Sequence, residues 1–196
     1  YPIPSFNVPM GVLIPKQDDV DNLIVAEKSV SVSNLINGAT RLQPVVMQLG
    51  QAAGVLAALS VIENIPVKRV SVRSVQRNLL ESGCYIMPYL DLPKEHQHFK
   101  ALQRIGAAGL LRGEGRNVGW ANQTWFRADD PLLAEEIFTD GYCGMPDALD
   151  SGEVKIGQLL TVLESIGFTV PDEDVEKWWD SLGLSSYDVD RTATRL

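Results

Sequence analysis

The chain has 196 residues, 45% of them hydrophobic, and its 25 acidic and 17 basic side chains give a formal net charge of −8. That length and apolar content suffice for one or two domains with buried cores. The acidic balance disfavours a nucleic-acid partner, because binding to phosphates requires a basic face. Cys84 and Cys143 share no CxxC spacing, so the sequence indicates neither a zinc ribbon nor a disulfide framework.

The first 33 residues combine turn-forming residues with short apolar runs. The run Gly11 to Ile14 precedes a proline and is expected to be extended. The acidic segment after it lacks the glycine and glutamate of an EF-hand loop, so we expect a solvated turn. Leu23 to Ala26 is predicted to form a short buried strand. Ser29 to Ser33 alternates serine with valine, as a half-buried strand or a loop does, and an arginine-bearing loop is expected after it.

A long helix without charged residues is predicted from Leu42 to Ile62. Pro44 suits its first turn, where a missing amide has no cost. Gly50, Gly54 and Ala58 are four residues apart, so they form one stripe of minimal bulk, which favours close approach by a backbone or a ligand. The start of such a helix presents free amides and a positive dipole to an anion or a carbonyl oxygen.

Two other interpretations of this helix stay open. It could be a core helix packed on a sheet, or a membrane span, since about twenty uncharged residues can cross a bilayer. We expect no membrane span, because alanines replace most leucines and polar residues interrupt the run: Gln43, Gln48, Gln51 and Ser60.

The chain changes character near Met87, where we place a boundary between residues 1–86 and a mainly helical domain of residues 87–196. Before the boundary, a helix is predicted from Ser74 to Glu81, ended by Gly83. After it, the glycine-rich run from 113 to 119 is interpreted as a turn. Further helices are predicted from Asp91-Pro93 through Phe99, Leu102, Ile105 and Leu110, from Asp130-Pro131, from Ser151 to Ile166, and from Pro171 to Leu182.

Candidate chemistry in the second half is sparse. His96 and His98 are two residues apart, so a helix would direct them to different faces, and we predict no metal site. Trp120 and Trp125 flank hydrogen-bonding residues in a predicted loop, a mixture that sugars favour. Aromatic residues between helices more often fill a core, so both hypotheses stay open. No catalytic residue can be assigned.

The segment LIPKQDDVDNLIVAEKSVSVSNLINGATRLQPVVMQLGQAAGVLAAL resembles the C-terminal end of FAD-dependent oxidoreductases of the glutathione-reductase type. Relatives in bacteria often carry the name xanthan lyase. The resemblance implies that Ala26 and Glu27 end a strand near the flavin, and that Arg41, Leu42 and Gln43 begin a helix whose amides face the isoalloxazine carbonyl. Glu27 departs from the family, which often has glycine there, and its carboxylate would be unfavourable beside phosphates.

This resemblance implies a C-terminal piece of an FAD-binding α/β domain. No strand followed by G-x-G-x-x-G occurs in the chain. The chain opens within what looks like the middle of a fold, so we interpret it as a fragment whose partner is the missing N-terminal FAD-binding domain of the same protein. We expect the parent to be a flavin-dependent oxidoreductase, and the fragment alone to bind no FAD, to lack activity, and to pack Gly50 and Gly54 against protein.

The sequence from Asp91 to Phe138 resembles an S-layer homology repeat, in which a capped helix, a glycine turn and an aromatic loop precede a second helix. This resemblance implies a helical scaffold and a periplasmic or extracellular location. Two alternative functions follow: a xanthan-lyase-like protein acting on polysaccharide, or a non-catalytic carbohydrate or cell-envelope module. Lyase chemistry would need a base and cationic groups. Conceivable candidates are Tyr85, Tyr89, His96 and Arg104, but no motif joins them.

Overall fold

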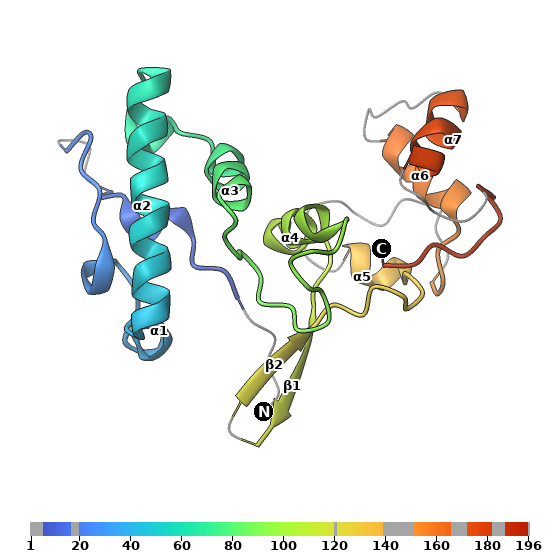
Figure 1. Cartoon of the computed structure of the whole chain (residues 1–196), viewed down its shortest axis with the longest axis horizontal. Helices are drawn as coiled ribbons and strands as arrows, with labels where there is room; N and C mark the ends of the chain where they lie inside the picture. Colours follow the sequence, from blue (N-terminus) through green and yellow to red (C-terminus); the bar gives the residue numbers. More distant parts are fainter. Residues whose placement is uncertain are drawn as a thin grey trace. The chain divides into compact units, whose positions relative to one another are not determined.

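The computed structural model describes residues 6–16, 20–119, 121–138, 151–165, 172–181 and 187–195. These residues contain seven α-helices, three short 3-10 helices and one two-stranded sheet, so the predicted mainly helical class is confirmed. The chain divides into a first unit, Phe6–Pro88, and a second unit that begins at Tyr89. Figure 1 draws the first unit from blue to green and the second from yellow-green to red.

Two consecutive helices form the centre of the first unit. Helix α1 (Asn34–Thr40) is capped by Ser33, whose hydroxyl accepts a backbone amide hydrogen bond at 3.3 Å. This cap satisfies an amide that would otherwise lack a partner, and the segment predicted to be a loop is therefore helical. Helix α2 (Gln43–Glu63) has Pro44 in its first turn, as predicted, and ends at Asn64 in a left-handed conformation with φ 51°.

A third helix completes the core of the first unit. Helix α3 (Val72–Glu81) packs against α2 (Figure 1). Its predicted end is confirmed, because Gly83 has φ 79° and Cys84 N–H donates back to Leu79 O at 2.9 Å. Two clusters of buried side chains line α2. One contains Leu13, Val30, Leu49 and Ala53, and the other contains Leu56, Val67, Val70 and Val75.

The described residues before α1 form no strand, contrary to prediction. Met10–Leu13 is a 3-10 helix, η1, and not an extended run. Leu23 to Ala26 is irregular, and Leu23 is 49% exposed. Val25 N–H donates to Leu13 O at 2.8 Å, but no neighbouring strand in the described part of the chain continues a ladder. An apolar run becomes a strand only where a second strand satisfies its backbone groups.

Helix α2 carries apolar residues on every side, interrupted by Gln48, Gln51 and Ser60, but buries only one of its faces. Val46, Leu49, Ala53 and Leu56 are buried. The opposite side is exposed, and we call it the outer face of α2. A helix that is hydrophobic all round is normally enclosed by other protein or by lipid. The outer face comprises Met47, Gly50, Gln51, Gly54, Ala58 and Val61.

The glycines of this outer face contradict the expected packing against protein. Gly50 and Gly54 are both exposed, and a Cβ atom added at either would meet no atom within 4 Å. Met47 and Val61 on the same face are 75% and 80% exposed. The expectation was wrong because the remaining described residues of the unit pack on the opposite side of α2.

Among the described helices, α2 is long and apolar enough to cross a membrane, with 21 residues and a mean hydropathy of 1.8 in its most apolar window. Only 28% of that window is buried inside the structure. Core helices of large domains have the same length and composition. The length and composition of α2 therefore fit both a protein core and a membrane.

The second unit contains a hairpin where the sequence indicated a turn and a loop. Strand β1 (Glu114–Val118) pairs antiparallel with β2 (Ala121–Trp125), so that Glu114 lies opposite Trp125. The interpretation of the run from 113 to 119 as a turn was wrong, because residues 114–118 form a strand that pairs with β2. Gly119, with φ 60°, follows β1 where the chain reverses.

Asp91 ties distant backbone together and does not cap a helix. Helix α4 (Phe99–Ala108) begins later than predicted, and Leu110 lies beyond its end, 49% exposed. The Asp91 carboxylate accepts hydrogen bonds from Phe126 N–H at 2.8 Å and Arg127 N–H at 2.6 Å. A charged acceptor for two amides is a strong local constraint, and it holds the end of the hairpin beside residue 91.

Three short segments of the second unit form a closed ring of backbone hydrogen bonds. Leu132 N–H donates to Ala193 O at 2.8 Å, Ala193 N–H to Val154 O at 2.7 Å, and Val154 N–H to Leu132 O at 2.9 Å. All three residues are buried. The antiparallel pairing continues to donors two residues later and acceptors two residues earlier, with bonds from Ala134 N–H to Gly152 O, Ile156 N–H to Arg191 O, and Arg195 N–H to Asp130 O.

Two helices begin directly after ring segments. Helix α5 (Ala134–Phe138) and helix α6 (Ile156–Ser165) start later than predicted, because the ring pairs the preceding residues. Glu136 accepts from Leu133 N–H at 3.4 Å, and Gln158 accepts from Lys155 N–H at 2.9 Å, as in capping boxes. The predicted last helix is confirmed as α7 (Asp172–Ser181).

Candidate functional site

The first candidate site is the N-terminal end of α2. Leu42 precedes the helix in an extended conformation, no side chain caps it, and its first turn carries no acidic residue. Val46 N–H donates to Leu42 O at 3.0 Å, so the amides before Val46 have no acceptor within the helix. Arg41 and Gln43 are exposed here. This end suits a negatively polarised oxygen, because free amides and the helix dipole both present positive charge.

The other two residues predicted to face a flavin lie beside the middle of α2. Ala26 packs against the buried cluster that contains Leu49 and Ala53, about two turns beyond the start of the helix. Glu27 begins the 3-10 helix Glu27–Ser29 and is exposed. The structure therefore places Ala26 and Glu27 beside the middle of α2, whereas Arg41 to Gln43 lie at its start.

Glu27 has a backbone conformation that residues other than glycine rarely adopt. Its φ of 59° lies in the left-handed region, which favours glycine. This observation gives a physical reason for the glycine that the resemblance places at this position. The carboxylate also adds an exposed negative charge that phosphate groups would avoid.

The first unit fits one side of a flavin ring and not the whole dinucleotide. The free amides of α2 suit a ring carbonyl oxygen, and the outer face of α2 has no charge and little bulk around Gly50 and Gly54. The described residues contain no glycine-rich turn between a strand and a helix, which is the usual cradle for a pyrophosphate.

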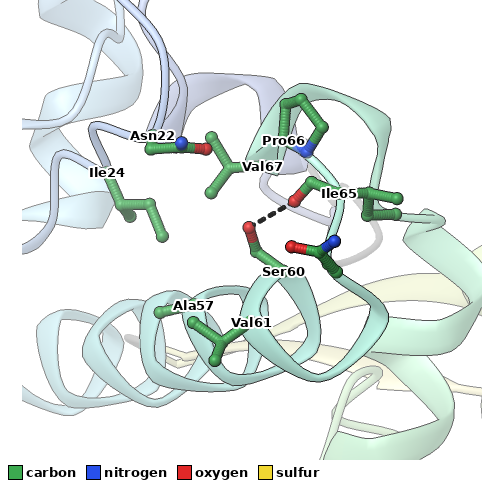
Figure 2. A pocket seen from close by; sticks show the side chains of 9 residues that line it. Asn22, Ile24, Ala57, Ser60, Val61, Ile65, Pro66 and Val67 are labelled. Atoms are coloured by element: carbon green, nitrogen blue, oxygen red, sulfur yellow. Dashed lines mark hydrogen bonds between the residues drawn. The ribbon is translucent and has the colours of Figure 1, made fainter.

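A cavity in the first unit lies away from these residues, at the C-terminal end of α2 (Figure 2). Its volume is about 500 Å³, and no charged side chain lines it. The Ser60 hydroxyl donates to Ile65 O at 2.6 Å, so the one hydroxyl of the lining is already engaged. The cavity therefore offers no activated nucleophile. Its lining consists of Asn22, Ile24, Ala57, Ser60, Val61, Asn64, Ile65, Pro66 and Val67.

Two tryptophans were considered either for carbohydrate contact or for filling a core. Trp120 lies outside the described residues, and Trp125 belongs to β2. The Trp125 indole N–H donates to Gln123 Oε1 at 3.2 Å, and the Arg116 guanidinium carbon lies 5.7 Å from the ring centroid. The polar edge of Trp125 is therefore engaged within the hairpin, and Arg116 stands over its ring.

A second cavity, of about 450 Å³, adjoins the ring of the second unit. The sequence suggested Thr194-Arg195 only as the start of a second, degenerate repeat, and predicted no site at Arg195, which is 7% exposed. Arg195 Nε donates to Phe126 O at 2.8 Å, and its two terminal nitrogens bond the Glu136 carboxylate and the Arg112 carbonyl. Hydrophobic periodicity extends over several residues, and Arg195 is followed in the sequence only by Leu196, so periodicity could not predict that Arg195 is buried.

The charges around this cavity are extensively paired. Arg127 lies 2.7 Å from a Glu114 oxygen and 3.1 Å from an Asp130 oxygen. Glu153 accepts a hydrogen bond from the Thr192 hydroxyl at 3.3 Å. Most charges of the lining are therefore held in ion pairs or hydrogen bonds, which suits a neutral polar ligand better than a small ion.

Neither Tyr89 nor the two histidines form a catalytic set in the described residues. Tyr89 is 4% exposed, and burial raises the pKa of its hydroxyl to about 12, so it is a poor proton acceptor near neutral pH. His96 and His98 rings have centroids 5.6 Å apart, and the His98 amide donates to His96 Nδ1 at 3.2 Å. No group of three potential metal ligands occurs among the described residues.

Comparison with known proteins identifies a class for the first part of the chain. Residues 1–79, fewer than half of the chain, match the family model described as FAD dependent oxidoreductase. They form a flavin-oxidoreductase-related region, which contains η1, η2, α1, α2, η3 and most of α3. FAD binding is a property of that family. The chain matches no curated protein and no solved structure.

Proposed function

We propose that residues 6–88 complete the FAD site of a longer flavin-dependent oxidoreductase and are not catalytic alone. The observation that carries this proposal is the exposed outer face of α2. A helix that carries apolar residues on every side and lies within a flavin-oxidoreductase-related region requires a cover that the described residues of the first unit do not supply. The cover in this proposal is the N-terminal FAD-binding domain of the same protein, of the glutathione-reductase type.

In the assembled site, a bound flavin supplies electron transfer, and this chain supplies position and charge. The amides at the start of α2 would hold a ring carbonyl oxygen and would stabilise negative charge on it. Arg41 and Gln43 add polar contacts at the same end. Gly50 and Gly54 keep the adjacent surface flat, so that protein or ring can approach the helix backbone.

A direct test is to express the longer coding region and to record its visible absorption spectrum. The expected result is a yellow protein that releases flavin on denaturation, whereas the 196-residue chain titrated with FAD shows no binding. The proposal fails if the upstream sequence contains no strand followed by G-x-G-x-x-G, or if the folded longer protein is colourless and takes up no FAD.

A pair of variants tests the outer face itself. Gly54→Leu places a bulky side chain where the described chain leaves open space, so the 196-residue chain should fold as before. In the longer protein the same change should lower flavin content several-fold, because the cover can no longer approach. Arg73→Leu, on an exposed position of α3, is the matched control. Unchanged flavin content in Gly54→Leu would contradict a role for this face.

A second candidate function concerns carbohydrate and rests on the polar cavity beside Arg195. In this alternative the second unit is an S-layer-homology-like module in a periplasmic or extracellular protein, or part of a xanthan-lyase-like enzyme. The charged side chains of the lining offer a polyhydroxylated ligand hydrogen bonds, and the exposed Pro131 and Leu133 offer it an apolar surface. Trp125, which lies opposite the lining residue Glu114 in the hairpin, would add an aromatic ring to this ligand's contacts.

Tryptophan fluorescence tests this alternative, because all four tryptophans lie after residue 119. Titration of the whole chain with xanthan should change the emission, and Trp125→Phe should reduce that change relative to Trp179→Phe. Release of unsaturated sugars would support lyase chemistry. An emission spectrum that xanthan and other acidic polysaccharides leave unchanged would remove the alternative.

A further inference from the structure

We draw no further inference here: the strongest candidate, the uncharged outer face of α2 in the first unit, belongs to the FAD site already proposed, and nothing else among the described residues shows what covers it.

Discussion

The Arg195 guanidinium stacks over the ring of Phe126, with 5.1 Å between its central carbon and the ring centroid, while its Nε donates to the carbonyl oxygen of the same residue at 2.8 Å. One side chain thus satisfies the backbone and covers the ring of a residue 69 positions away. The three hydrogen-bonded segments around Leu132, Val154 and Ala193, the hairpin and α5 all meet at this contact.

Replacing Arg195 should destabilise the second unit strongly. Arg195→Ala leaves the Glu136 carboxylate and two carbonyl oxygens without their donor, and breaking such a buried pair costs about 3–5 kcal/mol. Denaturant unfolding followed by tryptophan fluorescence measures the loss. Arg191→Ala, on an exposed side chain of the same segment, is the control and should change stability little. Equal effects of the two variants would contradict the structural role of Arg195.

Gly113 should not tolerate a side chain. A Cβ atom there would lie 2.5 Å from Thr124 Cγ2 and 2.9 Å from Tyr89 Cε1, so Gly113→Ala overpacks the site and should cost about 1–3 kcal/mol. Adding Thr124→Ser removes the closest methyl group and should recover part of the loss. A double variant no more stable than Gly113→Ala would show that Thr124 is not the obstacle.

Removing the Tyr89 hydroxyl should stabilise the second unit by about 1 kcal/mol, because that oxygen is buried and has no hydrogen-bond partner among the described residues. The variant should also change how the free energy of unfolding depends on pH in the alkaline range. Folding raises the pKa of Tyr89 from 10 to about 12, so the unfolded chain loses the proton first, and stability falls as pH rises through that window. Tyr89→Phe lacks this component. Identical unfolding curves for both proteins from pH 9 to about 11 would contradict the prediction.

Glu27→Gly should stabilise the first unit by about 1 kcal/mol, because φ of 59° strains a residue with a Cβ atom. Thermal unfolding followed by far-ultraviolet circular dichroism reports the change. Lys28→Gly, at the neighbouring exposed position, is the control and should be neutral or destabilising. A gain in Lys28→Gly equal to that in Glu27→Gly would point to charge or composition in place of backbone strain.

Gly50→Ala and Gly54→Ala should each stabilise α2 by about 1 kcal/mol, because alanine favours a helix and open space surrounds both positions. Ala58→Gly, on the same exposed face, should have the opposite effect. Circular dichroism during denaturant unfolding measures all three. Destabilisation by Gly54→Ala in the 196-residue chain would mean that something already packs on the outer face.

The sequence by itself determined the helices that local signals define. Pro44 and the uncharged run gave α2, and Gly83 marked the end of α3 to within a residue or two. The start of α2 as a site for an oxygen atom also followed from the sequence, since free amides and dipole are properties of the helix alone.

Only the tertiary structure decided which faces are covered and which distant groups meet. Asp91 and Phe126, or Arg195 and Glu136, are joined by contacts that no spacing encodes, so a helix cap was predicted where a long-range tie occurs. Leu23 to Ala26 shows the converse, because an apolar run without a partner strand has no ladder to join. The predicted burial of Gly54 failed for the same reason, since burial depends on what packs opposite a residue.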